Sequence, residues 1–115
     1  GLSLFTSTST ERFFMGNIGG NYGFISYAAP GANRFNGPGS SQGATTFMVY
    51  QLQPNGANVN VNFYANPAFG AAPPASPTDT ANVGNFSFDT LRLGTGGNMQ
   101  FDEIRFGSSW GSVVP

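Results

Sequence analysis

The sequence predicts an all-β fold, an antiparallel β-sandwich or jelly roll. Short runs of residues alternate between apolar and polar side chains, and turn-forming residues separate these runs. No segment shows the apolar repeat of an amphipathic helix. Twelve Phe, 17 Gly and 8 Pro in 115 residues are also typical of short strands joined by turn-rich loops. A chain of this length forms one domain at most, and its core is small for two full sheets.

The first part of the chain predicts three strands followed by a loop. The segments "GLSLF", "ERFFMGNI" and "YGFISY" each contain a run with strand-like alternation, and Gly19-Gly20 separates the second from the third. Residues 30–44, "PGANRFNGPGSSQGA", are dense in Gly, Pro, Asn and Ser. We therefore expect a long loop over 30–44.

The central part predicts a hairpin with one apolar and one amide-rich face. "TTFMVYQLQ" is the strongest strand signal, and Pro54-Asn55-Gly56 after it predicts a turn. In "ANVNVNFYANP", Val59, Val61 and Phe63 alternate with Asn58, Asn60 and Asn62. Such a strand is expected on the surface of the core, with one face in water. Residues 66–85 are rich in Pro, Ala and Ser and predict a second long loop.

A seven-residue motif occurs twice near the C-terminus, as "FDTLRLG" at 88–94 and "FDEIRFG" at 101–107. Residues two apart share a face of a strand, so each copy has an aliphatic face and an arginine on the opposite face. "TGGNMQ" between the copies predicts a hairpin. We expect the aliphatic side chains to be buried and both arginines to reach water. The buried set is Leu91, Leu93, Ile104 and Phe106, and the arginines are Arg92 and Arg105.

The composition excludes several classes of function. The chain has no Cys, His or Lys, which excludes disulfides, Cys/His metal sites and His- or Cys-based catalysis. A net charge of -1 gives no basic surface for nucleic acid. No apolar run reaches the ~18 residues of a membrane span, and "GLS" does not resemble a signal peptide. We interpret the chain as a mature or excised piece of an exported protein.

The acidic residues argue against a glycoside hydrolase. That chemistry needs two carboxyl groups roughly 5–10 Å apart on either side of the scissile bond. The chain has five carboxylate side chains and no Glu-x-Asp pattern. Asp102 and Glu103 are adjacent, so a strand would place them on opposite faces. The sequence therefore predicts a protein that is not an enzyme.

The chain resembles a known family over nearly its whole length, from "GLSLF" and "ERFFMGN" onward, and most specifically in its last thirty or so residues. The segment "FSFDTLRLGTGGNMQFDEIRFGSSWGSVVP", together with "TTFMVYQLQ" and "VNFYANP", is similar to the C-terminal part of concanavalin-A-like lectin/glucanase jelly rolls of the LamG type in exported bacterial proteins. The resemblance implies a partial jelly roll, an extracellular or cell-surface setting and a structural calcium at Asp102 in the last strand. Calcium needs six to eight oxygen ligands. The alternative is that Asp102 accepts hydrogen bonds from turn amides or from Trp110.

Glycan binding without catalysis needs aromatic platforms and amide or carboxylate hydrogen-bonding groups. The candidate platforms are Tyr22, Tyr27, Tyr50, Tyr64 and Trp110, and the richest amide row is Asn58, Asn60 and Asn62. From these we select a ligand-binding set: Tyr50, Asn58, Asn60, Asn62, Tyr64 and Trp110. The alternative is that the aromatic residues fill the core and the Asn row is simply a solvated face.

Two functions from different classes remain. The first is a non-catalytic, extracellular lectin-like module that binds glycan or another cell-surface polymer. The second is a structural cell-surface or filament subunit that self-assembles by packing of strands and sheets. We further expect that another polypeptide completes the fold, as a homo-oligomer, a filament neighbour or an N-terminal half of the domain. Alternatively, the loops at 30–44 and 66–85 fold over the sheet and cover it.

Overall fold

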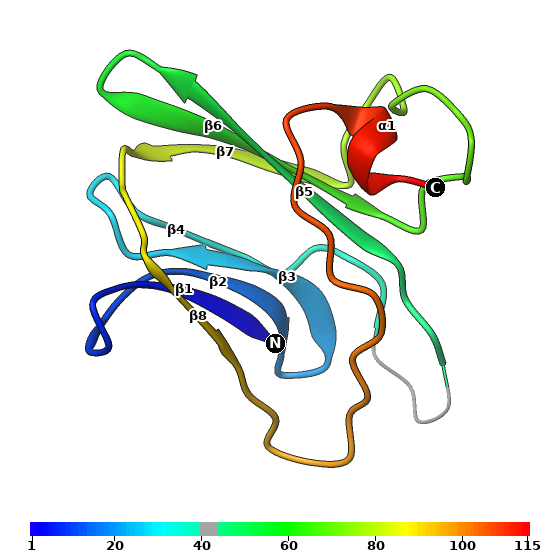
Figure 1. Ribbon diagram of the computed structural model, residues 1–115, viewed down its shortest axis with the longest axis horizontal. Coiled ribbons are helices and arrows are strands. Elements are labelled where there is room, and N and C mark those ends of the chain that lie inside the picture. The colour runs from blue at the N-terminus through cyan, green and yellow to red at the C-terminus, as the bar shows by residue number, and fades with distance from the viewer. Residues whose placement is uncertain (40–43) are drawn as a thin grey trace.

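The protein consists of two antiparallel β-sheets that face each other, as seen in a computed structural model that describes residues 1–39 and 44–115 (Figure 1). Almost no helix is present, and the all-β prediction is confirmed. The elements are β1 (Leu2–Thr6), β2 (Thr10–Ile18), β3 (Asn21–Ser26), β4 (Ala32–Arg34), β5 (Met48–Asn55), β6 (Asn58–Ala65), β7 (Asp79–Gly84), β8 (Thr90–Leu93) and the short helix α1 (Trp110–Val113).

The strands divide unequally between the sheets. Sheet A has five strands in the order β4-β3-β2-β1-β8, and sheet B has three in the order β5-β6-β7. Neighbouring strands in each sheet follow one another along the chain, except that β8 returns to pair with β1. Across the part of the chain that the structure covers, no helix is long and apolar enough to cross a membrane.

The core lies between the two sheets and follows the alternation of the strands. Leu4, Phe13 and Phe24 project from sheet A, and the rings of Phe13 and Phe24 stack with their centroids 5.6 Å apart. Val61 and Phe63 of β6 meet them from sheet B, and all five side chains are at most 1 % exposed. The period-two pattern therefore assigns the inner face of β6 correctly.

The β5–β6 hairpin forms where the sequence predicts a turn. Its two connecting residues are Gly56 and Ala57, between the paired residues Asn55 and Asn58. Gly56 has a φ of 63°, a conformation that glycine adopts without a steric penalty. This turn fixes the register in which Gln51 lies opposite Asn62 and Gln53 lies opposite Asn60.

Both predicted long loops contain a strand. Residues 30–44 include β4, and residues 66–85 include β7, while residues 40–43 lie outside the described part of the chain. In β7, Ala81 and Val83 point inward and alternate with Thr80 and Asn82. This alternation was hidden because the preceding Pro- and Ser-rich residues dominate the composition of the segment. The strand forms because β6 offers it an edge to pair with.

The predicted hairpin of the repeated motif is wrong. Residues 88–94 contain β8, but residues 101–107 form no strand, and the chain runs away from sheet A after β8 before it returns to α1 on sheet B (Figure 1). Arg92 and Arg105 are exposed as predicted. The predicted burial of the aliphatic face is wrong, because Leu91, Leu93, Ile104 and Phe106 are 48, 48, 47 and 58 % exposed.

The position of sheet B explains this exposure. Leu91 and Leu93 pair with Leu4 and Leu2 of β1, so they do point toward the space between the sheets. However, β7 contacts β4 and β3 at the opposite side of sheet A from β8. Three strands then cover only part of a five-stranded sheet. The interior face of β8 is left open.

Candidate functional site

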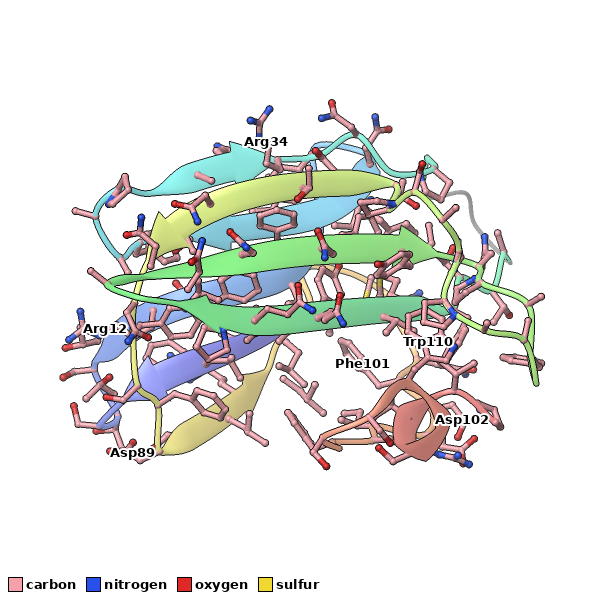
Figure 2. The ribbon with its side chains drawn as sticks, turned by 90° about the horizontal axis from the view of Figure 1, so that it is seen from above. Arg12, Arg34, Asp89, Phe101, Asp102 and Trp110 are labelled. Carbon is pink, nitrogen blue, oxygen red and sulfur yellow. The ribbon has the colours of Figure 1, made fainter. Side chains whose placement is uncertain are left out.

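Amide side chains form a grid on the outer face of sheet B, and Figure 2 looks onto this face. Asn58, Asn60 and Asn62 point outward because Val59, Val61 and Phe63 between them are buried in the core. The neighbouring strands add polar side chains that share this face by register. We call the following set the amide face: Gln51, Gln53, Asn58, Asn60, Asn62, Thr80 and Asn82.

Hydrogen bonds connect the amide face across its three strands. Asn58 Nδ2 donates to Asn82 Oδ1 at 2.7 Å, and Asn82 Nδ2 donates to Asn60 Oδ1 at 2.6 Å. Asn62 Oδ1 accepts from Thr80 Oγ1 at 2.9 Å, while Asn62 Nδ2 donates to Gln51 Oε1 at 3.0 Å. These bonds hold the side chains in fixed orientations. The predicted Asn row is thus part of a wider hydrogen-bonded surface.

Sequence reasoning missed four members of the amide face. Gln51 and Gln53 alternate with Tyr50 and Leu52 in a segment that was correctly assigned as a strand, so the pattern could have revealed them. Thr80 and Asn82 were hidden in the predicted loop 66–85. Their place beside Asn62 and Asn60 depends on the β6–β7 register, which the sequence does not determine.

An aromatic cluster closes one end of the amide face. Tyr64 continues the outward row of β6, but α1 packs over it and leaves it 7 % exposed. The rings of Tyr64 and Trp110 meet edge to face, with centroids 5.0 Å apart. Trp110 is partly exposed, and its Nε1 donates to the carbonyl oxygen of Ala71 at 3.0 Å. Trp110 is therefore the aromatic surface beside the amide face, and Tyr64 supports it from below.

The remaining predicted platforms lie elsewhere. Tyr50 points into the core, where its ring stacks on Phe63 with centroids 4.8 Å apart and its hydroxyl donates to the carbonyl oxygen of Gly23 at 2.8 Å. Burial raises the pKa of Tyr50 well above its usual value. Tyr22 is partly buried against the core, and Tyr27 is 51 % exposed just after β3. Desolvation, followed by the nearby Glu11 carboxylate, raises the pKa of Tyr27.

Asp102, the candidate calcium ligand, is exposed in the segment between β8 and α1. Its neighbour Glu103 has a φ of 51° and forms an ion pair with Arg105. Within residues 1–39 and 44–115, no three carboxylate side chains come together as a metal-binding group. Calcium at Asp102 stays a prediction.

Two further carboxylates, Asp79 and Asp89, accept hydrogen bonds on separate elements. Asp79 Oδ2 accepts from Asn36 Nδ2 at 2.6 Å beside β4. Asp89 Oδ1 accepts from the backbone N–H of Ser7 and from Thr90 Oγ1, both at 2.8 Å. These hydrogen bonds lower the pKa of Asp89 below 3.8, with the Thr90 hydroxyl as the larger cause.

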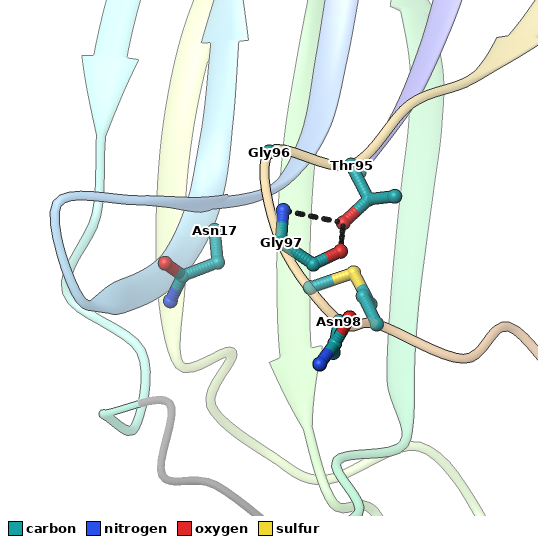
Figure 3. Close-up of a pocket in the computed structure, with 7 residues that line it drawn as sticks. Asn17, Thr95, Gly96, Gly97 and Asn98 are labelled. Carbon is teal, nitrogen blue, oxygen red and sulfur yellow. Dashed lines mark hydrogen bonds between the residues drawn. The ribbon is translucent and has the colours of Figure 1, made fainter.

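Two hollows flank the uncovered side of the molecule. The smaller has a volume of about 270 Å³ and lies beside the Gly-rich residues after β8. Figure 3 shows Asn17, Gly96 and Asn98 at its rim, with Thr95 Oγ1 accepting from the N–H of Gly97 at 3.1 Å. The larger, which we call the open groove, has a volume of about 1770 Å³. Its apolar lining includes Leu2, Leu4, Met15, Met48, Leu52, Phe88, Phe101, Ile104 and Phe106.

Comparisons with known proteins give no match to this chain, whether with protein-family models, curated proteins or solved structures. The functional argument therefore rests on the chemistry of the amide face and of the open groove.

Proposed function

We propose that this protein is a non-catalytic binding module that holds an uncharged, extended glycan on the amide face. The observation that carries this proposal is the hydrogen-bonded grid of amides with Trp110 at one end. Amides donate and accept hydrogen bonds, which matches the hydroxyl groups of a sugar. A partly exposed indole provides an apolar surface for a sugar ring.

The geometry favours a polymer over a small sugar. Outward residues recur every ~6.8 Å along a strand, and neighbouring strands lie ~4.8 Å apart, so the face presents regularly repeated polar groups. A primary amide has two N–H donors and an oxygen with two lone pairs. Asn82 uses one donor and one acceptor position within the grid, which leaves one of each for a ligand. No member of the amide face is charged, which favours a neutral partner.

Several broader features belong to the same proposal. The fold is a jelly-roll sandwich of the lectin-like type, and the protein works outside the cell, as its low charge and its resemblance to exported proteins suggest. The dispersed carboxylates support a role in binding rather than hydrolysis, because Asp79, Asp89 and Glu103 have separate local partners.

Binding of cello-oligosaccharides of six units, followed by the NMR signals of the Asn and Gln side-chain amides, tests the proposal. Asn60→Ala and Asn82→Ala should each weaken binding roughly tenfold, because each removes a hydrogen-bonding partner worth about 1–1.5 kcal/mol. Asn33→Ala is the matched control, since Asn33 is an exposed residue of β4 in the other sheet. It should leave affinity unchanged.

A panel of soluble neutral polysaccharides in affinity electrophoresis extends the test to polymers. Retardation of the protein by at least one polysaccharide, lost in Asn60→Ala but kept in Asn33→Ala, supports the amide face as the site. If Asn33→Ala reduces retardation as much as Asn60→Ala does, the amide face is not the binding surface.

The open groove favours a second candidate function, a structural subunit that self-assembles. Nine large hydrophobic side chains are exposed among the described residues, and six of them lie between residues 88 and 106. Soluble monomers rarely expose contiguous apolar patches beyond a few hundred Å². These six are Phe88, Leu91, Leu93, Phe101, Ile104 and Phe106.

A further inference from the structure

The outer edge of β8 is an unpaired strand edge beside an apolar surface. The N–H of Gly94 donates to the carbonyl oxygen of Gly1 at 3.0 Å, and the N-terminal amino group of Gly1 donates to the carbonyl oxygen of Gly94 at 2.7 Å. Peptide groups alternate in direction along an antiparallel strand, so those of Leu91 and Leu93 point away from β1. Within residues 1–39 and 44–115, no strand pairs with that edge. Such an edge is a template for another strand.

The open groove, lined by Phe88 just before β8 and by residues 98–107 after it, is larger than a small-molecule pocket. Pockets for small molecules usually have volumes of ~300–1,000 Å³. The open groove has about 1770 Å³ and is lined by apolar side chains from both sheets. A small ligand would leave much of this lining in water. Leu91 and Leu93 lie outside that lining and are exposed on β8, so an added strand would satisfy the peptide groups of β8 and cover these two side chains.

We propose that residues 101–107 of a second copy of this chain pair with the free edge of β8, in the antiparallel direction. The two segments are the two copies of the repeated motif, and each has two exposed aliphatic or aromatic side chains on one face. In the structure, residues 101–107 are exposed and outside any strand, and pairing would require Glu103 to leave its φ of 51°. In the resulting dimer, which we call the exchange, β8 of each copy pairs with residues 101–107 of the other copy.

Charge selects the register of this pairing. When Leu91 lies opposite Ile104, Arg92 lies opposite Glu103, and cross-strand pairs of opposite charge are favourable. A shift by two residues in one direction places Arg92 opposite Arg105, which is unfavourable. A shift in the other direction places Leu91 opposite Asp102. The charged pair therefore decides. The register with Arg92 opposite Arg105 would align both apolar pairs, whereas the selected register has one apolar pair, Leu91 with Ile104, beside the pair of opposite charge and places Leu93 opposite Asp102.

The anchored position of Trp110 opposes pairing of residues 101–107 with β8 of the same chain in this register. In the selected register Phe106 would lie opposite Asp89, and Trp110 follows four residues later. Four extended residues span at most ~14 Å. Trp110 is held on sheet B by Tyr64 and Ala71, and Figure 2 shows it on the other side of the molecule from Asp89. A second copy has no such tether to this β8.

Sedimentation equilibrium of two charge variants tests the exchange at low ionic strength. The unmodified chain should form a dimer whose population rises with concentration. Arg92→Glu and Glu103→Arg should each weaken dimerisation roughly tenfold, because each places like charges opposite one another at both junctions of the dimer. An equimolar mixture of the two variants restores opposite charges at both junctions and should recover the affinity.

The mixture separates this proposal from its alternatives. A second copy that docks without residues 101–107 gives no recovery on mixing, which overturns the proposal. A chain that stays monomeric up to a few hundred micromolar also overturns it.

Amide hydrogen exchange provides an independent measurement on the unmodified chain. The N–H groups of Leu91 and Leu93 should become protected as the dimer forms, whereas that of Gly94 is bonded to Gly1 in the monomer already. Protection of Leu91 and Leu93 that does not depend on concentration would indicate pairing within one chain and would overturn the exchange. This inference does not depend on glycan binding by the amide face.

Discussion

At the scale of single residues, Asp89 shows how one side chain fixes a turn. Its carboxylate accepts hydrogen bonds from Ser7 after β1 and from Thr90 at the start of β8. Ser7 has a φ of 58°, an uncommon conformation for a residue other than glycine. The carboxylate therefore ties the turn after β1 to the strand that pairs with β1.

These hydrogen bonds make stability depend on pH. The pKa of Asp89 is lower in the folded chain than its usual value of 3.8, so its contribution to stability is present above that value. The contribution is lost as the pH falls through the folded-state pKa. We expect Asp89→Asn to lower the urea midpoint at pH 6 and to leave it nearly unchanged at pH 2. An equal loss at both pH values would show that the charge of Asp89 is not responsible.

Phe63 and Leu91 both occupy apolar positions of a strand pattern, but their different burial predicts different costs for truncating them. Phe63→Ala should lower the free energy of unfolding by ~3–5 kcal/mol, since Phe63 is fully buried between the sheets. Leu91→Ala should cost about 1 kcal/mol or less in the monomer, because this side chain is already 48 % exposed. The same small cost is expected for Ile104→Ala. Chemical denaturation at low micromolar concentration measures all three, and equal costs for Phe63 and Leu91 would contradict the exposure of Leu91 on β8.

Calcium binding at Asp102 is testable by its effect on the melting temperature. An ion that binds only the folded state raises the Tm with the logarithm of its concentration above the dissociation constant. We expect millimolar calcium to raise the Tm of the unmodified chain relative to a chelator, and Asp102→Asn to remove the shift. Identical Tm values in calcium and chelator exclude the ion.

At the scale of elements, alternation predicted strands well where a neighbouring strand was available. The segments of β1, β2, β3, β5, β6 and β8 were all assigned as strands from their pattern. Residues 101–107 have the same pattern as β8 and remain unpaired, because a strand also needs an edge to bind. In β7 the reverse holds, since the β6 edge stabilises a strand in a segment whose composition is typical of a loop.

The helix α1 is a docked element whose stability depends on a few contacts. Val114 is 4 % exposed beside Val49 and Tyr64, and its N–H donates to the carbonyl oxygen of Trp110 at 2.9 Å. Since Trp110 is the single tryptophan, its fluorescence reports on this docking. Val114→Ala should shift the emission to longer wavelength while the far-ultraviolet circular dichroism of the sheets stays unchanged. An unchanged emission spectrum would mean that α1 does not depend on Val114.

The candidate site was predictable in part for the same reasons. Alternation was sufficient to place Asn58, Asn60 and Asn62 on one outer face of β6. Tyr50 lies away from the amide face because its register opposite Phe63 directs it inward, and an aromatic side chain suits a core and a binding face equally well. The contact of Trp110 with Tyr64 joins residues far apart in the sequence, and no local pattern contains it.

At the scale of the whole molecule, the unequal sheets govern the surface chemistry. Sheet B covers the side of sheet A that contains β3 and β4 and leaves β8 open. The outer face of sheet B is polar and hydrogen-bonded, whereas the open groove has a largely apolar lining and β8 has an edge that is unpaired among the described residues. The molecule thus has two surfaces of different character. A ligand on the amide face and a second copy on β8 need not compete.

The open groove should bind a hydrophobic dye in a folded chain, and this binding should decrease with protein concentration. The apolar lining of the groove is accessible in the monomer, which predicts fluorescence of anilinonaphthalene sulfonate at low micromolar protein. When residues 101–107 of a second copy pair with β8, Phe101, Ile104 and Phe106 of the groove lining are covered together with Leu91 and Leu93, so the fluorescence per chain should fall. Glu103→Arg weakens this pairing and should keep the fluorescence per chain high at the same concentration. Dye fluorescence per chain that is constant over the concentration range in which the unmodified chain dimerises would show that the dimer leaves the groove open.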